Sequence, residues 1–251
     1  MVVPPAADVS QRVAVVTGAG SGIGRAAAEV LAGRGFAVAA VDLNTGAARA
    51  TARLSEAITP LGADVADDES VAALAETVLA RLGAPQAVVN CAGWDETHRF
   101  LETGAPFWQK VVAINYLGVV RVTHAFLGPM VEAGRGGRVV NVASDAGRVG
   151  SSGESVYAGA KGGVIAFTKS IAREAARYGI TANTVCPGPT ETPLFRSQPE
   201  KLQEALERSI PLKRLAQPAD VAHAIAYFVS EEAAFVTGQV LSVSGGLTMA
   251  G

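Results

Sequence analysis

Residues 12–42 read RVAVVTGAGSGIGRAAAEVLAGRGFAVAAVD and join two short apolar runs, 12–16 and 36–41, through a glycine-rich turn and a helical pattern. The turn, TGAGSGIG at 17–24, follows the first run directly. Glycines between a strand and a helix let backbone N–H groups approach a pyrophosphate at the positive end of the helix. The stretch therefore predicts a strand, a phosphate-binding turn and a helix, with a plain tight turn as the alternative interpretation.

The same alternation continues along the chain. Further apolar runs lie at 86–89, 138–142, 180–185 and 239–243. Runs that are apolar on both faces suit a parallel sheet, and each parallel crossover needs a helix-length connection. Helical patterns occupy about 22–33, 44–56, 67–82, 106–133, 155–178 and 218–230. We therefore predict an α/β fold with a single doubly wound parallel sheet (Rossmann-type) and helices on both faces.

Two segments depart from this pattern. The segment 57–66 should hold a third strand, which Pro60 and Gly62 limit to a very short one. The segment 187–211 contains five prolines and is expected to leave the sheet as a substrate lid. We predict a flexible N-terminal segment at 1–10 and a single Rossmann-type domain at 11–251.

Composition narrows the function classes. The chain has 251 residues, 49% of them hydrophobic, and a net charge of −2 with Lys and Arg spread along the sequence, so no nucleic-acid partner is expected. Cys91 and Cys186 form no C-x-x-C and no Cys/His cluster, which disfavours a metal site and fits a reducing cytoplasm. No apolar run approaches the roughly 18 to 20 residues that span a bilayer, so no membrane association is expected.

Acidic residues follow the second and third expected strands. Asp42 lies 18 residues after Gly24, where a carboxylate can accept hydrogen bonds from an adenosine ribose and would repel a 2′-phosphate. Leu43 and Asn44 follow without a cation, so NAD is preferred to NADP as the cofactor. Asp64, with Val65, is expected beside the adenine, although a helix N-cap role for Asp64 is the alternative.

A second constellation lies in the middle of the chain. Tyr157 and Lys161 are four apart in a helical pattern, so their side chains share one face. Ser144 ends an expected strand 13 residues before Tyr157. Asn115 lies inside a long helical pattern, an unfavourable position that needs a reason; a helix kink or a bond to the preceding turn is the alternative to a catalytic role.

With these residues in this order, the chain resembles the short-chain dehydrogenase/reductase family over nearly its whole length. Further matching motifs are Asn90-Cys91-Ala92-Gly93 and Pro187-Gly188, and Cys91 departs from the family's usual second Asn. The resemblance implies a catalytic set of Asn115, Ser144, Tyr157 and Lys161 and, with the residues above, a cofactor site of Gly18, Gly20, Ser21, Gly22, Ile23, Gly24, Asp42, Leu43, Asp64, Val65, Asn90, Ala92, Gly93, Tyr157, Lys161, Pro187, Gly188, Thr190 and Thr192. The implied substrate residues are Trp94, Ser144, Asp145, Arg148, Ser151 and Tyr157.

The implied roles agree with acid–base chemistry. Tyr157 would act as general base for alcohol oxidation and as general acid for ketone reduction, but a free phenol has a pKa near 10. The Lys161 ammonium and the positive nicotinamide would lower that pKa. Ser144 would donate a hydrogen bond to the substrate oxygen. The Asn115 carbonyl, through a water, would connect Lys161 to solvent.

Four stretches, 92–95, 144–154, 186–192 and 241–248, resemble more narrowly those members that oxidise a cyclic β-hydroxyacyl-CoA during breakdown of alicyclic and aromatic acids. Another ketone or alcohol, such as a 3-oxoacyl thioester or a simple cyclic or aryl secondary alcohol, is the alternative. A CoA ester needs cations for its phosphates, for which Arg99, Arg148, Arg196 and Lys201 are candidates or simply surface residues. Trp94 either forms an apolar wall of the site or packs under the lid.

Two other classes fit part of the pattern. A non-catalytic nucleotide sensor needs the glycine turn and Asp42 but has no need of the Ser, Tyr and Lys set. A methyltransferase also uses a glycine-rich turn and an acidic residue. The resemblance further implies a homo-oligomer, a tetramer, in which the helices at 106–133 and 155–178 pair between subunits, although core packing alone could explain their apolar faces.

Overall fold

The computed structural model describes residues 11–250, whose strands form one parallel sheet of seven in the order β3-β2-β1-β4-β5-β6-β7. This confirms the predicted doubly wound α/β fold, while the expectation for residues 1–10 lies outside the described residues. The strands are β1 Arg12–Thr17, β2 Phe36–Asp42, β3 Ile58–Gly62, β4 Ala87–Asn90, β5 Gly137–Val142, β6 Ile180–Pro187 and β7 Val240–Val243.

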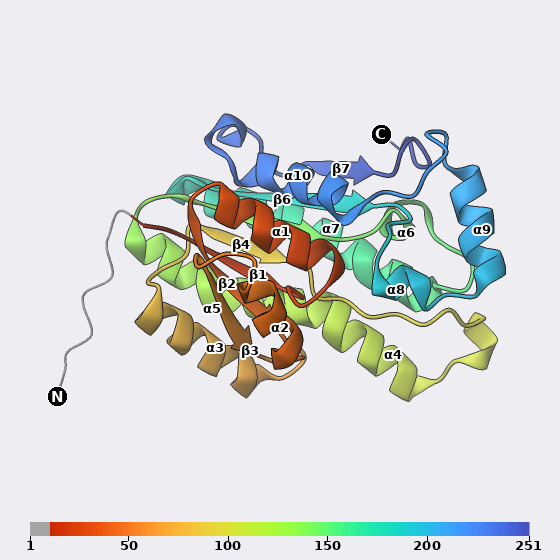
Figure 1. Cartoon of the computed structure of the whole chain (residues 1–251), viewed down its shortest axis with the longest axis horizontal. Helices are drawn as coiled ribbons and strands as arrows, with labels where there is room; N and C mark the ends of the chain where they lie inside the picture. The colour runs from red at the N-terminus through yellow and green to blue at the C-terminus, as the bar shows by residue number, and fades with distance from the viewer. Residues whose placement is uncertain (1–10, 251) are drawn as a thin grey trace.

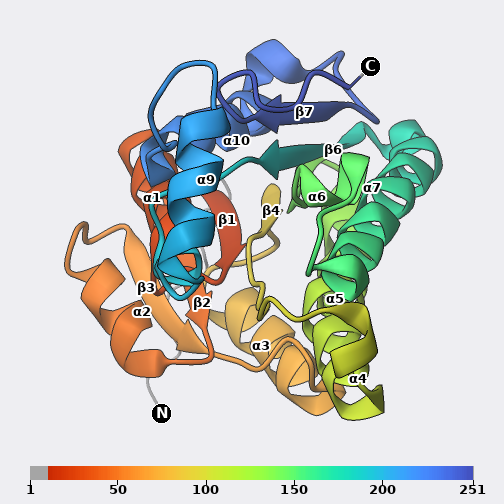
Figure 2. The same ribbon diagram turned by 90° about the vertical axis from the view of Figure 1, so that its right-hand side faces the viewer.

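Helices cover both faces of the sheet (Figures 1 and 2). On one face α1 (Gly22–Gly33) packs against α10 (Pro218–Val229), and their alanine and valine side chains form a core with β1 and β2. On the other face lie α3 (Asp68–Arg81), α5 (Gly118–Ala133) and α7 (Ser155–Ala175). The short α2 (Thr45–Ala52) lies beside β3 at the sheet edge.

The third strand is as short as its sequence predicts. β3 has five residues and contains Pro60, which has no N–H to donate. The strand lies at the edge of the sheet and pairs with β2 alone. An edge strand needs only one row of ladder bonds, so the proline is tolerated there.

Three helical features differ from the expectation. The pattern at 106–133 is not one helix, because a π-helical turn at Ala113–Leu117 separates α4 (Ala105–Val112) from α5. The segment expected to be an irregular lid instead contains α8 (Pro193–Arg196) and α9 (Glu200–Ser209). A further short helix, α6 (Ala146–Val149), follows β5.

The segment Ala105–Ala133 corrects the expectation that no apolar stretch is long enough to span a bilayer. Its 29 residues reach a mean hydropathy of 1.4 over an 18-residue window, which by length and composition is enough to cross a bilayer. In the fold, α5 packs on α3 and the sheet, and α4 packs on α7. The core helix of a globular protein passes the same composition test, so the segment is weak evidence for a membrane span.

The ends of β1 and β4 are tied together at the point where the strand order reverses. Chain connections run from β1 toward β2 on one side and from β4 toward β5 on the other. The Thr17 hydroxyl accepts hydrogen bonds from the backbone N–H groups of Cys91 (3.1 Å) and Ala92 (3.2 Å). In such sheets ligands bind in the crevice at the carboxyl ends of these strands.

A buried polar chain connects the sheet with the helices behind it. Asn90 Nδ2 donates to Asn141 Oδ1 (2.8 Å) and to Thr123 Oγ1 of α5 (3.2 Å). Asn141 Nδ2 donates in turn to Thr168 Oγ1 of α7 (2.9 Å), and this hydroxyl donates to the Val164 carbonyl (2.7 Å). Side chains that are at most 2% exposed thus hold the helices α5 and α7 against the strands β4 and β5.

Replacing Asn141 by alanine should destabilise the protein by about 2–3 kcal/mol. The change leaves Asn90 Nδ2 without its 2.8 Å acceptor and Thr168 without its 2.9 Å donor, both in the core. Urea unfolding followed by circular dichroism measures the loss. The matched control is Thr77→Ala on the exposed face of α3, which should cost well under 1 kcal/mol; equal costs would contradict the role of the network.

Candidate active site

The glycine-rich turn leaves the start of α1 open to an anion. Ser21 is the N-cap residue but makes no side-chain capping bond, and the first turn of α1 has no acidic residue. Gly18 and Gly22 have φ of +65° and +50°, and a Cβ on Gly24 would lie 2.2 Å from the Gly18 carbonyl oxygen. The turn therefore requires glycine, and the backbone N–H groups at the start of α1 suit a phosphate.

Asp42 joins the end of β2 to this turn. Its carboxylate accepts hydrogen bonds from the N–H groups of Gly20 and Asn44, both at 2.8 Å. A Cβ on Gly20 would come within 2.7 Å of both Asp42 Oδ2 and Ala47 Cβ. Each carboxylate oxygen keeps a lone pair for a further donor such as a ribose hydroxyl. The neighbouring Leu43 side chain is exposed.

Residues after β3 and β4 have more structural roles than the sequence indicates. Asp64 accepts from Ala66 N–H (2.8 Å) and does not cap α3, whose N-cap is Asp67, so the alternative N-cap interpretation is wrong. Val65 is buried against Gly118, where a Cβ would lie 2.9 Å from Val65 Cγ2. The Asn90 side chain is engaged in the core, which leaves only its backbone for a ligand.

Ser144, Tyr157 and Lys161 line one cavity of about 410 Å³ at the carboxyl end of the sheet. Ser144 follows β5, and the other two project from the first turns of α7. Lys161 Nζ donates to the Val142 carbonyl (2.9 Å) and lies 5.7 Å from the centre of the Tyr157 ring. The ammonium therefore anchors α7 to the end of β5 and brings the three side chains together.

Asn115 lies in the π-helical turn and is fully buried. Its Nδ2 donates to the Trp94 carbonyl (2.6 Å) and to the Val111 carbonyl (2.9 Å), and its Oδ1 accepts from Trp94 N–H (3.1 Å). The alternative interpretation, a helix distortion with a bond to the preceding turn, is thus present in the fold. The amide in addition fixes the loop after β4 beside the cavity.

Electrostatics favour the neutral phenol. Burial raises the pKa of Tyr157, the carboxylates of Glu154 and Asp95 raise it further, and a hydrogen bond with Ser144 opposes the rise. Burial also lowers the pKa of Lys161 to about 8. The protein alone therefore presents Tyr157 as a proton donor, and added positive charge beside it is needed before it can act as a base.

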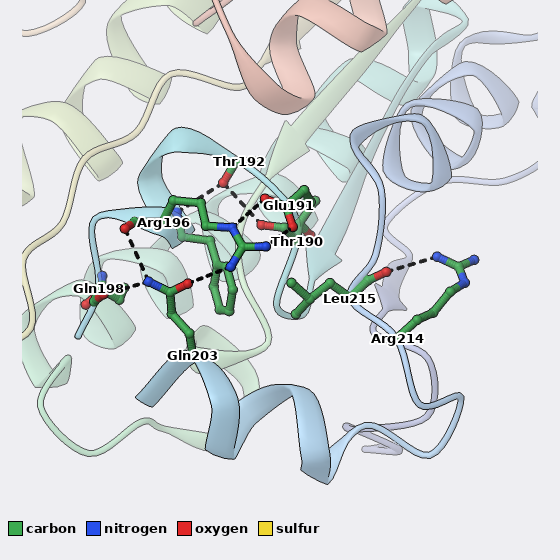
Figure 3. Close-up of polar contacts among 9 residues, drawn as sticks. Thr190, Glu191, Thr192, Arg196, Gln198, Gln203, Arg214 and Leu215 are labelled. Carbon is green, nitrogen blue, oxygen red and sulfur yellow. Dashed lines mark hydrogen bonds and ion pairs between the residues drawn. The ribbon is translucent and has the colours of Figure 1, made fainter. Parts of the chain in front are cut away.

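The segment 187–211, called the lid from here on, contributes apolar side chains to the wall of this cavity. Phe195, Leu202 and Leu206, from α8 and α9, line it together with Leu247. Figure 3 shows how the lid is held: Arg196 Nε donates to Glu191 (2.6 Å) and its Nη1 to Gln203 (2.9 Å). Gln198, at the lid, also accepts a hydrogen bond from the Thr97 hydroxyl of the loop after β4.

The predicted substrate residues divide into two groups. Asp145 and Ser151 line the cavity. Arg148 instead donates to Ser242 Oγ (2.7 Å) and to the Ala250 carbonyl. The Trp94 ring packs on α4, 5.8 Å from the Phe107 ring and 3.4 Å from Lys110 Nζ, and it does not line this cavity in the described structure.

Several cavity residues were missed at the sequence level. These are Asp95, Glu154, Val149 and the lid side chains. The two acidic residues had a signal, because one follows the Asn-Cys-Ala-Gly motif closely and the other comes three residues before Tyr157. Within residues 11–250 no three His, Cys, Asp or Glu side chains group as a metal site would require.

The segment after β6 lies over the glycine turn. A Cβ on Gly22 would lie 3.0 Å from Thr192 Cγ2, and one on Gly18 would lie 2.9 Å from the Ala92 backbone. Ile23 and Gly93 line the cavity together with Pro187, Gly188, Thr190 and Thr192. The turn and the candidate catalytic side chains are thus joined by one continuous surface, and the residues present fit a dinucleotide.

Comparison with known proteins agrees with this geometry. The family model described as enoyl-(acyl carrier protein) reductase matches residues 18–248. The chain belongs to the short-chain dehydrogenase/reductase family. The chain is therefore an oxidoreductase with a Rossmann-type fold that acts on CH–OH groups and uses a nicotinamide cofactor.

Similar proteins act on several substrates. A rat (3R)-3-hydroxyacyl-CoA dehydrogenase is 41% identical over 248 residues, which cover 94% of this chain and 96% of that protein. The cis-4-hydroxycyclohexanecarboxylate dehydrogenase of Sinomonas cyclohexanicum is 41% identical over 243 residues, covering 95% and 97%. The crystal structure of a single-residue variant of actinorhodin polyketide ketoreductase with NADPH aligns with a TM-score of 0.90 at 37% identity, covering 96% and 99%.

Replacing Gly20 by alanine should lower dinucleotide affinity about tenfold or more. The added methyl would collide with Asp42 Oδ2 and Ala47 Cβ, both 2.7 Å away, and move the carboxylate from the turn. Quenching of tryptophan fluorescence by NADH measures the dissociation constant. Gly33→Ala, at the end of α1 with nothing within 4 Å, is the control and should bind NADH like the wild type.

Proposed function

We propose that this protein catalyses the reversible, NAD-dependent oxidation of a secondary alcohol to a ketone on a cyclic β-hydroxyacyl-CoA such as 2-hydroxycyclohexanecarboxyl-CoA. The observation that carries the proposal is the cavity in which Ser144, Tyr157 and Lys161 lie together with apolar lid residues. A cavity of about 410 Å³ accommodates a ring-sized acyl group.

The chain's own residues would act as follows. The bound nicotinamide supplies the site for hydride exchange. Ser144 donates a hydrogen bond to the substrate oxygen, whose negative charge grows during oxidation. Tyr157 takes the hydroxyl proton in that direction and returns it during reduction. Lys161, together with the positive charge of the oxidised cofactor, offsets the burial that raises the pKa of the phenol.

Asn115 has a positioning role in this scheme, because its amide holds both backbone groups of Trp94. The family resemblance adds a proton path from Lys161 through the Asn115 carbonyl and a water. A π-helical turn supports this path, since backbone carbonyls in such turns lack part of the regular helical bonding.

NAD is favoured over NADP by the charge at the end of β2. The Asp42 carboxylate is fixed by two backbone N–H groups, so it cannot easily turn away from a 2′-phosphate. The exposed Leu43 beside it supplies no positive charge. The related ketoreductase structure contains NADPH, so this preference is a distinguishing feature to be tested in this chain.

The thioester part of the proposal is supported by the rat relative, which is named a hydroxyacyl-CoA dehydrogenase. Of the four cations considered for the CoA phosphates, Arg148 and Arg196 are held by internal partners. Arg99 and Lys201 are exposed, next to the loop after β4 and at the start of α9. These two are the better candidates.

A second candidate is a free hydroxycyclohexanecarboxylate, the substrate named for the Sinomonas relative. Another ketoacyl thioester or a simple cyclic or aryl alcohol is the broader alternative. A non-catalytic nucleotide sensor is less well supported, because Ser144, Tyr157 and Lys161 are placed together around a cavity.

The proposal includes a cytoplasmic homotetramer that acts in the degradation of alicyclic or aromatic acids. Only 39% of the apolar window in Ala105–Ala133 is buried within one chain, and Trp108 and Leu117 remain partly exposed. Pairing of this segment and α7 with a second subunit would remove these side chains from water.

A substrate screen tests the proposal directly. Oxidation of 2-hydroxycyclohexanecarboxyl-CoA, the free acid and cyclohexanol is followed by NADH absorbance, with NADP as the alternative cofactor. We expect kcat/KM to be about tenfold or more higher for the thioester than for the other two, and higher with NAD than with NADP. Equal or faster turnover of cyclohexanol would contradict the acyl-CoA assignment.

Tyr157→Phe should lower kcat about 10²- to 10⁴-fold, because the variant has no proton to exchange. The affinity for NADH should stay nearly unchanged, since the ring remains in place. Stopped assays measure turnover and fluorescence titration measures binding. Tyr178→Phe, outside the cavity lining, is the matched control with wild-type activity; activity retained in Tyr157→Phe would refute the assignment.

A further inference from the structure

Two carboxyl groups lie in the cavity wall beside Tyr157 without a part in the mechanism. Asp95, in the loop after β4, and Glu154, at the N-terminus of α7, both line the cavity. The Asp95 side chain is only 4% exposed, and neither of its carboxylate oxygens receives a hydrogen bond from the described part of the chain. Burying a carboxylate without a hydrogen-bond donor costs folding free energy, so we expect Asp95 to have an external partner or a function.

The two segments that carry these residues are locked together. His98 N–H donates to the Gly153 carbonyl (2.9 Å), and a Cβ on Gly153 would lie 2.7 Å from Thr97 Cγ2. On the other side of Asp95, Trp94 is held by the Asn115 amide. The carboxyl groups therefore cannot move apart without breaking these contacts.

Glu154 faces Asp95 rather than its own helix. It is the N-cap residue of α7, yet its side chain makes no capping bond. Burial, followed by the negative charge of the nearby Glu154, raises the pKa of Asp95 to about 7. Asp95 therefore becomes fully negative only above neutral pH, where its charge adds to the negative charge already in this part of the wall.

The surroundings do not neutralise this charge. Asp145, also in the cavity wall, has one buried oxygen without a partner. Glu96 adds a further negative charge close to Asp95. Among the described residues that line the cavity, Lys161 is the one cationic side chain, and its Nζ is bound to the Val142 carbonyl.

We propose that Asp95 and Glu154 form a charge-selecting wall that excludes substrates with a free carboxylate near the reacting carbon and accepts neutral or hydrogen-bond-donating groups. The wall would make the enzyme require the thioester, a neutral form of the acid, which deepens the proposed function and rests on it for the reaction. It also disfavours free 2-hydroxycyclohexanecarboxylate, in which the carboxylate lies next to the reacting carbon.

Binding of unreactive ligands tests the wall separately from turnover. The probes are cyclohexanecarboxylate and cyclohexanecarboxamide, which have one ring and differ in charge, titrated by calorimetry into protein saturated with NADH at pH 8. The wild type should bind the amide about tenfold or more tightly than the acid. Asp95→Asn and Glu154→Gln should each reduce this ratio at least threefold, mainly by tighter binding of the acid.

Glu102→Gln is the matched control, because it removes one negative charge from an exposed side chain of the same connection between β4 and α4, outside the cavity lining and away from the groups that act on Asp95. Its amide-to-acid ratio should equal that of the wild type. A wild-type ratio near one, or ratios that Glu102→Gln changes as much as the two wall variants, would overturn the proposal. If the amide preference is present but no acyl-CoA is oxidised, the wall stands and the proposed substrate fails.

Thermal unfolding supplies a readout that needs no ligand. The folded pKa of Asp95, about 7, is above its ordinary 3.8, so its contribution to stability is complete below pH 4 and lost as the pH rises through 7. The groups that set this behaviour are Glu154, Glu96, Tyr157 and Lys161.

Asp95→Asn should therefore raise Tm by about 3 °C or more at pH 8, and by only about a quarter of that at pH 4.5. Glu102→Gln should leave Tm unchanged at both values. An equal shift of Asp95→Asn at the two pH values would mean that Asp95 has only a packing role, and it would overturn the charge-selecting wall.

Discussion

The close approach of β1 and β4 at their carboxyl ends is the constraint on which the rest of the site depends. One threonine hydroxyl accepts from two successive N–H groups that follow the neighbouring strand, and Gly18 leaves no room for a side chain against Ala92. Because the connections leave in opposite directions at this point, they open a crevice beyond the strand ends. The glycine turn, the loop with Asp95 and the segment after β6 all meet in the space that results.

Catalytic geometry is then set by polar groups that belong to the core. The chain from Asn90 through Asn141 to Thr168 fixes α7 against β5, and Lys161 makes a second bond to the end of the same strand. Tyr157 is thus placed by contacts that lie a helical turn or more away from it. The lid is different in kind, because Arg196, Glu191 and Gln203 hold it through exposed ion pairs and amides, which are weaker and more easily exchanged with water.

Local patterns predicted most of the fold and the residues that we propose as the catalytic set. The glycine turn, the apolar runs and the Tyr-x-x-x-Lys spacing each depend on neighbouring residues, so the sequence was enough to place them. The contacts of Arg148 and Trp94 with Ser242, Ala250 and Phe107 could not be predicted, because these partners are reached only through the tertiary fold. The lid helix Glu200–Ser209 was missed because its polar composition, between prolines, resembles a loop. The proposed role of Asp95 and Glu154 depends on their proximity in the cavity wall, which the sequence does not show.

The π-helical turn at Ala113–Leu117 acts as one extra residue inserted into an otherwise continuous helix. One residue corresponds to a rotation of about 100°, so the segments before and after it are out of phase. Asn115 can therefore hold the loop after β4 while Val122 and Phe126 still pack in the core beneath the sheet. A homologue that lost one residue here would have a regular helix of nearly the same length, but it would present a different face to that loop. The length of this segment can thus change the shape of the substrate site while the hydrophobic core stays as it is.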